Sequence, residues 1–431
     1  MRAITILRLM ALATLATGPT ASAQVTAIIG GTVYPVNGPR IENGTVLMRG
    51  GKIIAVGTNV LVPADAERID ARGKWVTPGF INSATSLGLS EGGSPQFSGG
   101  YNDTGARATD GVTAAFEAWK GLNPANTFII PARQEGVTSV LVAPTGGMVG
   151  GQAAVIDLID AVAAGEMVRR APLAMVGDFG NPLGGSTDSR AEYWARWRRL
   201  LDDVKAYQGR RAAYEAGNTR DLEASRANLE ALGPVVSGQM PLSLGVDRAS
   251  DIIAALAFAK DYGLRLWIRG GAEAWMVARE IAAARVPVFT GAMSNIPTDF
   301  NSLGQRQENA GLLRAAGVTV VLIGNGPGGP ESFNVRNIRQ EAGNAVAYGL
   351  SWDDALRSIT LAPAEVLGVA GQIGAIATGL DANVVVWSGD PFEFSSVAEQ
   401  VFVRGRTFDT KSRQQQLTER YLTLPPAYRR P

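Results

Sequence analysis

The chain of 431 residues contains no cysteine and no histidine. Without cysteine it can form no disulfide, no thiolate nucleophile and no thiolate metal site. Without histidine it lacks the side chain that proteins use most often as a general base and as a transition-metal ligand. These two absences exclude Ser-His-Asp catalysis, histidine-ligated zinc and cysteine-dependent hydrolysis before any motif is considered.

Charge of either sign is also scarce. Charged residues make up 18% of the chain, with 40 Lys and Arg against 39 Asp and Glu, for a formal net charge of +1. A balanced chain without a basic block is not typical of proteins whose main partner is nucleic acid, so we expect no such partner. Hydrophobic residues amount to 46%, which is the composition of a folded globular protein.

Residues 1–23 have the pattern of a secretory signal peptide. Arg2 supplies the positive charge, Leu9–Ala16 forms an apolar run too short to span a bilayer, and Ala21-Ser22-Ala23 fits the small-x-small cleavage rule. We therefore expect cleavage before Gln24 and export to the periplasm or the medium. The rest of the chain has no other long apolar run, so we expect no membrane span after cleavage.

Two separate segments have the pattern of short β-strands. Within residues 24–78, strand-length apolar runs are separated by the glycine pairs Gly30-Gly31 and Gly50-Gly51. The β pattern returns in residues 372–410, which contain the run Val384-Val385-Val386-Trp387. We predict that the two segments pair into one small composite β-sandwich domain.

Residues 79–371 have a different sequence pattern, in which apolar runs of strand length alternate with helical patterns. This alternation predicts parallel βα units, and eight of them make a (β/α)₈ TIM-like barrel of the α/β class. A charged helical insertion is expected at about residues 188–233, and residues 411–431, with Pro425-Pro426, are expected to form an extended C-terminal tail. The candidate strands are Phe80–Ser83, Val112–Phe116, Val137–Ala143, Pro172–Gly177, Pro241–Val246, Leu264–Ile268, Pro287–Thr290 and Val318–Ile323.

Three carboxylates follow predicted barrel strands and are candidate pocket residues. They are Asp178, Asp247 and Glu273. Because active sites of such barrels form at the carboxyl ends of the strands, these groups are placed to act as an acid–base pair or to bind a hard cation such as Ca²⁺ or Mg²⁺. The alternative is that they hydrogen-bond and cap helices near the loops.

Several motifs resemble the amidohydrolase superfamily, specifically its imidazolonepropionase-like branch. The motif Asp-Ala-Arg-Gly-Lys-Trp-Val-Thr-Pro-Gly-Phe-Ile at residues 70–81 is similar to the family's entry into the first barrel strand. Leu356–Ala364 is similar to its last barrel helix, and Gly374–Pro391 to its return to the β domain. The resemblance implies a barrel beside a β-sandwich made from both ends of the chain, and an ancestral zinc-dependent hydrolysis of carbon–nitrogen bonds.

The metal ligands that the resemblance implies are missing. On the first strand the family has Asp-x-His-x-His, and the two histidine positions correspond here to Ala84 and Ser86. Histidines of the fifth and sixth strands correspond to Gly245 and Gly270, and the eighth-strand aspartate corresponds to Asn325. All five positions carry small neutral side chains, so we expect neither zinc nor another cofactor, while a hard cation held by carboxylates stays open.

Three functional hypotheses remain open from the sequence. The first is a catalytically silent exported barrel that binds a small molecule in its mouth or associates with an active amidohydrolase paralogue, as a homo- or hetero-oligomer. The second is a divergent hydrolase of non-peptide carbon–nitrogen bonds that uses the three candidate carboxylates. The third is an exported binding protein unrelated to the family's substrates.

The signal-peptide assignment predicts that the exported protein begins at Gln24. Mass spectrometry of the protein recovered from the periplasm of a bacterial host should find this residue first. Ala23→Leu removes the small residue before the cleavage point and should leave the chain unprocessed, whereas Thr26→Ala should be cleaved normally. Exported wild-type protein that retains residues 1–23 would contradict the assignment.

Overall fold

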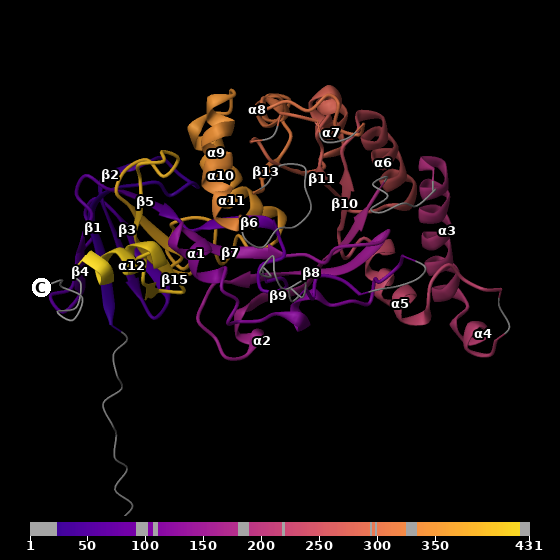
Figure 1. Cartoon of the computed structure of the whole chain (residues 1–431), viewed down its shortest axis with the longest axis horizontal. Coiled ribbons are helices and arrows are strands. Elements are labelled where there is room, and N and C mark those ends of the chain that lie inside the picture. The colour runs from indigo at the N-terminus through magenta and orange to yellow at the C-terminus, as the bar shows by residue number, and fades with distance from the viewer. Residues whose placement is uncertain are drawn as a thin grey trace, which may run out of the picture.

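The described chain contains two eight-stranded β-sheets. The computed structural model describes residues 24–91, 102–106, 111–179, 189–217, 220–293, 295–297, 300–324 and 334–422. The expected signal peptide and Asn325 therefore lie outside the described residues. Figure 1 shows the first sheet at the left of the view, with the barrel built on the second sheet beside it.

The first sheet combines both ends of the described chain, in the order β16-β15-β14-β5-β1-β2-β3, with β4 also paired to β1. The central join is antiparallel, with Val384 opposite Pro78 and Trp387 opposite Trp75. This pairing confirms the predicted composite β domain. Its strands are β1 Val25–Val33, β2 Ile41–Arg49, β3 Lys52–Gly57, β4 Glu67–Asp70, β5 Trp75–Pro78, β14 Val384–Trp387, β15 Ala398–Val403 and β16 Arg406–Phe408.

The second sheet runs in sequence order from β6 to β13 and forms a nearly closed barrel, which confirms the predicted fold class. Its first and last strands approach at Asn82, whose Oδ1 accepts the N–H of Gly324 at 3.5 Å. Its strands are β6 Phe80–Thr85, β7 Val137–Val142, β8 Val149–Asp157, β9 Val168–Asp178, β10 Leu242–Val246, β11 Leu266–Gly270, β12 Val288–Thr290 and β13 Val320–Leu322.

The second predicted strand, Val112–Phe116, is wrong. β6 pairs directly with β7, and the strand that completes the eight is β8, which lies between β7 and β9 and pairs antiparallel with both. The residues after Val112 run beside β8 and pair with it only through isolated bridges, Val112 with Val149 and Glu117 with Gln152. The prediction failed because the glycines at the start of β8 made this segment read as a loop, although every residue of the strand is buried.

Helices cover the outside of the barrel, and the expected insertion is helical. Helices α3 Arg190–Gly209, α4 Arg211–Glu215 and α5 Arg226–Val236 lie at the end of the molecule opposite the composite sheet (Figure 1). No helix of the described segments is both long enough and apolar enough to cross a membrane. The remaining barrel helices are α1 Ile129–Gln134, α2 Ala164–Met167, α6 Ala249–Tyr262, α7 Ala278–Ala284, α8 Asn309–Ala315, α9 Ile338–Ala347, α10 Trp352–Ser358 and α11 Leu361–Val366, with the 3₁₀ turns η1 Ala118–Gly121, η2 Ala274–Val277 and η3 Val335–Asn337.

The extended conformation predicted for the tail is wrong over Arg413–Leu422, which forms helix α12. A capping box starts the helix, because the N–H of Gln415 donates to Oγ of Ser412 at 3.2 Å and the N–H of Ser412 donates to Oε1 of Gln415 at 2.7 Å. Glutamine, leucine and arginine are good helix formers, and they fill this segment. The proline pair that suggested an extended chain, Pro425-Pro426, lies beyond the described residues.

A buried network of charges joins the barrel to both halves of the composite sheet. Asp157, at the end of β8, is fully buried and accepts hydrogen bonds from Arg169 Nη2 and Arg404 Nε, each at 2.6 Å. Arg169 also contacts Asp381 at 2.7 Å, and Asp381 pairs with Lys52 at 2.5 Å. Burial alone would raise the pKa of Asp381, but the hydrogen bonds from Lys52 and Arg169 outweigh it and hold the pKa below its usual range.

Asp381→Asn should destabilise the chain by about 3 kcal/mol, because it leaves part of a buried charge network uncompensated. Denaturant unfolding at neutral pH measures this loss. Asp261→Asn removes an exposed pair with Arg198 and serves as the matched control, with an expected cost below about 1 kcal/mol.

The difference in the free energy of unfolding between wild type and Asp381→Asn should also depend on pH. A carboxylate whose pKa is lowered on folding contributes stability above its unfolded pKa of 3.8, and this contribution is lost as the pH falls through the lower folded value. The gap between the two proteins should therefore narrow below about pH 4. If the difference in unfolding free energy stayed constant at and below that pH, the lowered pKa of Asp381 would be contradicted.

Candidate functional site

The interior of the barrel is a packed apolar core, so function must reside at its mouth. Arg170, at the start of β9, donates to the carbonyl oxygens of Leu367 and Gly368, which follow α11. Helix α11 therefore closes the amino ends of the strands and leaves the carboxyl ends as the mouth. The inward side chains include Ile81, Leu141, Val155, Val176, Trp267, Phe289 and Val321.

An ion pair crosses the barrel mouth between β9 and β11. Nη2 of Arg269 donates to Oδ1 of Asp178 at 2.6 Å and to the carbonyl oxygen of Gly177 at 3.3 Å. Between these strands lies Gly245 of β10, where an added Cβ would overlap Oδ1 of Asp178 and would lie 3.0 Å from Nη2 of Arg269. The ion pair thus fills the space into which a side chain at residue 245 would project.

A second carboxylate occupies the space beside Gly270. Oδ1 of Asp247, just after β10, accepts the N–H of Ala272 at 3.2 Å. A Cβ at Gly270 would lie 2.5 Å from that oxygen, and the backbone there has φ +95°, a conformation that side-chain-bearing residues rarely adopt. Neither glycine position has room for a larger residue in the present arrangement.

The third candidate carboxylate, Glu273, bonds to backbone groups. Its Oε2 accepts the N–H of Ala249 at the start of α6, and its Oε1 accepts the N–H of Gly304, both at 3.0 Å. It therefore fixes the segment after β12 against α6. Across the described parts of the chain, no group of three or more Asp or Glu residues is arranged to hold a metal ion.

The first-strand positions Ala84 and Ser86 are buried. Ala84 and Ser86 are 2% and 3% exposed, and Ala84 packs in the barrel core. Their neighbour Asn82 accepts the N–H of Ala84 at 3.3 Å and donates to the carbonyl oxygen of Val335 at 3.1 Å. Asn325, the eighth-strand position, falls outside the residues that the structure describes.

Arg269 is the site residue that sequence reasoning missed. It is 8% exposed, and its Nε is fully buried without a hydrogen-bond acceptor. Its Nη1 has no hydrogen-bond partner among the described residues and is not fully enclosed. The available signal was a lone charge inside the apolar strand Leu266–Gly270, but arginine is neither an acid nor one of the metal ligands that the family resemblance implies.

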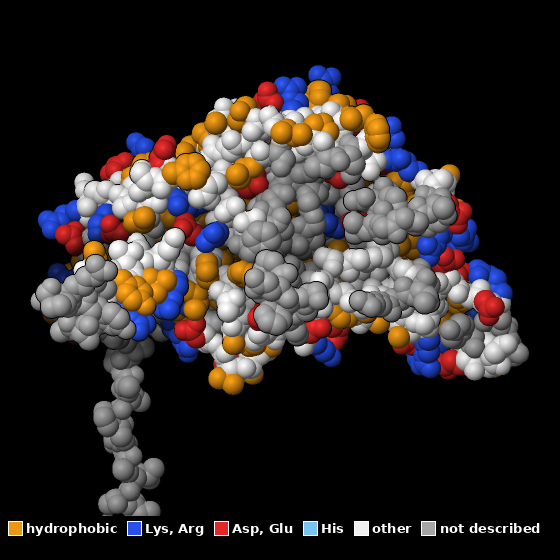
Figure 2. All heavy atoms as spheres, in the orientation of Figure 1, with side chains coloured by type: hydrophobic (Ala, Val, Ile, Leu, Met, Phe, Trp, Pro, Cys, Tyr) orange, Lys and Arg blue, Asp and Glu red, His pale blue; other side chains and the backbone are white. Residues whose placement is uncertain are grey.

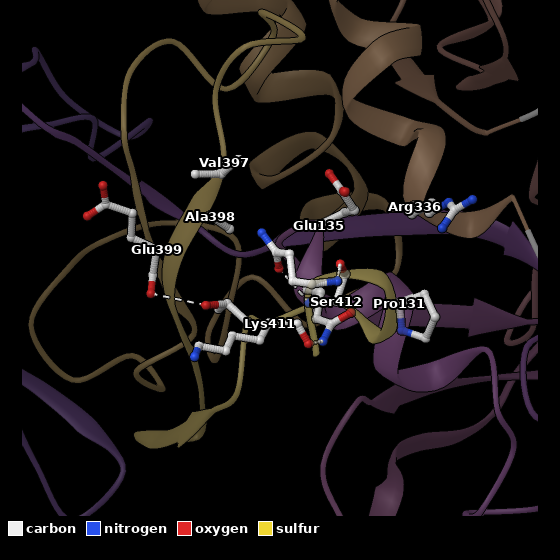
Figure 3. Close-up of a pocket in the computed structure, with 11 residues that line it drawn as sticks. Pro131, Glu135, Arg336, Val397, Ala398, Glu399, Lys411 and Ser412 are labelled. Carbon is white, nitrogen blue, oxygen red and sulfur yellow. Dashed lines mark hydrogen bonds between the residues drawn. The ribbon is translucent and has the colours of Figure 1, made fainter. Parts of the chain in front are cut away.

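A cavity of about 400 Å³ with charged residues in its lining is formed among α1, η3, β15 and the start of α12 (Figure 3). Three of its charged residues are already paired: Lys411 with Glu419, Glu399 with Lys74, and Glu135 with Arg339. The fourth, Arg336, directs its guanidinium away from Lys411 in Figure 3. This cavity therefore offers no set of charges free to bind a ligand.

Comparisons with known proteins agree with this fold. Residues 265–412 match the model of the amidohydrolase family. Amidohydrolase tasK of Hapsidospora irregularis is 25% identical over 84% of this chain but only 39% of its own length, so the chain spans well under half of that relative. An imidazolonepropionase of Acidiphilium cryptum is 25% identical over 82% of this chain and 89% of its own.

Solved structures agree as well. An amidohydrolase from Thermotoga maritima MSB8 superposes with a TM-score of 0.79 at 29% identity, covering 89% of this chain and 99% of its own. A molinate hydrolase superposes with a TM-score of 0.58 at 19% identity over 90% of this chain and 95% of its own, which supports the fold alone.

Gly245→Ala should destabilise the protein by about 2 kcal/mol, because the new methyl group overlaps the Asp178 carboxylate. Denaturant unfolding measures this cost. Gly371→Ala is the matched control, since nothing lies within 4 Å of a Cβ there, and it should change stability by less than about 1 kcal/mol.

A double-mutant cycle identifies the cause of that destabilisation. In an Asp178→Ala background the overlap no longer exists, so Gly245→Ala should then cost less than about 0.5 kcal/mol. Equal costs of Gly245→Ala in the two backgrounds would mean that Asp178 does not occupy the space beside the glycine.

Proposed function

Since the chain belongs to the amidohydrolase superfamily, in its imidazolonepropionase-like branch, we propose that it is a catalytically silent member that binds a small organic acid at its barrel mouth. The observation that carries this proposal is the Asp178–Arg269 ion pair beside Gly245. A hydrolase-family scaffold is retained, and the chemistry at its mouth is changed. The proposal includes export, which rests on the sequence of residues 1–23.

Zinc is the metal that the family resemblance implies, and the residues present do not fit it. Imidazole and thiolate ligands are absent from the whole sequence. Gly245 and Gly270 stand where two ligands are expected, and carboxylates already fill the adjoining space. Of those carboxylates, Asp178 is neutralised by Arg269, and Asp247 bonds to the backbone N–H of Ala272. We therefore derive no hydrolytic step through a metal.

Arg269 favours a carboxylate as the ligand group. Its guanidinium is held on one side by Asp178 Oδ1 and the carbonyl oxygen of Gly177, which fixes its orientation. Nη1 remains as an unpaired, not fully enclosed donor. A ligand carboxylate that binds to Nη1 loses its water molecules and gains a charge-assisted hydrogen bond in a nearly buried environment. The Asp178 side chain, 29% exposed, also lies at the edge of the site and would disfavour ligands with a second acid group close to the first.

A second candidate role, as a subunit beside an active amidohydrolase paralogue, is favoured by an exposed apolar surface. Figure 2 shows hydrophobic side chains gathered along the top of the view, over α7 and α8. Three apolar residues of the segment after β12, Ile296, Phe300 and Leu303, are also 76%, 83% and 61% exposed. Exposed apolar residues in this number are typical of a surface that contacts another protein. Light scattering of the purified chain, alone and mixed with such a paralogue, tests this role.

Calorimetric titration with acetate, propionate and N-acetylglycine tests the ligand proposal, with acetamide as the neutral comparison. At least one of the acids should bind, and acetamide should not. Arg269→Met should abolish the binding, whereas Arg279→Met, which removes an exposed arginine of α7, should leave it unchanged. Asp178→Ala removes the carboxylate partner of Arg269 and should tighten binding of the acids by about tenfold.

Two further variants distinguish a catalytically silent protein from one with a divergent hydrolytic activity. Turnover of a cyclic amide by the wild-type chain, lost in both Asp247→Asn and Glu273→Gln, would contradict the proposal and support the hydrolase hypothesis. Circular dichroism of each variant shows whether it folds. Asp178→Ala is a further control, because it is expected to bind the acids more tightly, and a misfolded variant would not.

A further inference from the structure

A cavity of about 780 Å³ lies where the composite sheet meets the barrel, and this volume is within the range of pockets that hold small molecules. It is lined by the chain after β1, by the start of β5 and by helix α10, which Figure 1 shows next to the composite sheet. Its lining includes none of the residues that form the barrel mouth. The cavity is therefore a second candidate binding site, independent of Arg269.

Three aromatic rings in mutual contact form one wall of this cavity. The ring centroids of Tyr34 and Trp75 are 4.8 Å apart, those of Tyr34 and Trp352 are 4.7 Å apart, and those of the two tryptophans are 5.4 Å apart. The three ring planes are inclined to one another by 33°, 46° and 74°, so the rings do not form one flat surface. Tyr34 is buried, whereas both tryptophans are half-buried and keep part of their surface accessible.

The indole ring of Trp352 is polarised by a carboxylate. Its Nε1 donates to the two carboxylate oxygens of Asp390 at 3.1 and 3.0 Å. A negative charge at the N–H edge of an indole pushes electron density toward the ring and makes its faces more negative. The faces of tryptophan rings already attract cations more strongly than those of tyrosine or phenylalanine. This wall is therefore suited to a positively charged ligand.

The uncompensated charge around the wall is also negative. Three nearby arginines each pair with one carboxylate: Arg40 with Glu42, Arg314 with Asp354, and Arg357 with Glu365. In the described part of the chain, the exposed Asp353 of the cavity lining has no partner, and Asp390 pairs with no cation. A cationic ligand complements this arrangement, and an anionic one does not.

The rest of the lining favours an organic cation over a metal ion. Val36, Pro39 and Leu356 contribute apolar surface to the cavity. A divalent metal ion needs several oxygen ligands, and the described residues contain no group of three or more Asp or Glu side chains arranged to hold one. An ammonium group that carries alkyl substituents is less strongly hydrated, and its substituents can cover aromatic and aliphatic surface while its charge faces the rings.

We propose that this cavity binds a small organic cation of the alkylated ammonium class. The cationic group lies against the rings of Tyr34, Trp75 and Trp352, and Asp353 supplies the countercharge. The cavity is thus a cation site at the junction of the two domains, separate from the anion site proposed at the barrel mouth.

Calorimetric titration of the full chain with choline and with benzyltrimethylammonium tests the proposal. Both cations should bind in saturable fashion. The neutral alcohol 3,3-dimethylbutan-1-ol has the shape of choline with carbon in place of nitrogen, and it should bind about tenfold more weakly. Saturating acetate should not compete with choline, because the proposed acid site lies at the barrel mouth.

A matched pair of variants tests the countercharge. Asp353→Asn keeps the size of the side chain and removes its charge, so it should weaken choline binding by about fivefold. Asp65→Asn makes the same change at an exposed aspartate that does not line the cavity, and it should leave choline binding unchanged.

A second pair of variants separates the effect of the ring from that of apolar surface. Trp75→Leu keeps an apolar side chain but removes the aromatic face, and it should weaken choline binding by at least about fivefold. Trp75→Phe keeps an aromatic face and should stay within about threefold of the wild type. Circular dichroism verifies that both variants fold.

Four outcomes would overturn the proposal. They are no saturable binding of either cation, equal binding of choline and its neutral analogue, equal binding by Asp353→Asn and Asp65→Asn, and equal binding by Trp75→Leu and Trp75→Phe. Sedimentation checks one further occupant: a wild-type dimer that Trp75→Leu converts to monomers, without binding of either cation, would assign the wall to contact with a second copy.

Discussion

The Asp178–Arg269 ion pair sets what the barrel mouth can do. It joins β9 to β11 across Gly245, and it holds a guanidinium that is 8% exposed. A buried arginine of this kind requires a carboxylate partner, and the pair in turn requires glycine on the strand between them. The same space cannot also hold the side chain of a metal ligand. In our proposal, an arginine able to bind an anion lies where the family resemblance implies a metal site.

The two ends of the barrel use buried aspartate–arginine pairs for different purposes. At the closed end, Asp157 is fully buried and satisfied by Arg169 and Arg404, which makes it a structural link to the composite sheet. At the mouth, Arg269 keeps an unsatisfied Nε and an unpaired Nη1. Buried hydrogen-bonding groups without a partner are rare in native proteins, and a functional role of the site is one explanation for them. This contrast is why we assign binding to the mouth and stability to the closed end.

The sequence predicted the architecture well because its signals were local. Glycine pairs marked the hairpins, and the apolar runs marked seven of the barrel strands, whereas β8 was missed because Gly150 and Gly151 interrupt its pattern. Helix α12 was missed because a proline pair after it outweighed the capping box at Ser412. The partners of Asp178, Asp247 and Glu273 were not predictable, since each depends on contacts between different strands or loops. Arg269 carried a signal, a charge within an apolar strand, but its meaning depended on the position of Asp178.

The central claim is that an ion pair has replaced the metal centre of the family. Elemental analysis of the purified chain tests this most directly, before and after incubation with Zn²⁺, Mn²⁺ and Ca²⁺ followed by gel filtration. The account predicts that no metal approaches one ion per chain, in the wild type and in Asp178→Ala alike. One tightly held ion per chain in the wild type, lost in Asp178→Ala, would show that the carboxylates have rebuilt a metal site and would contradict the account.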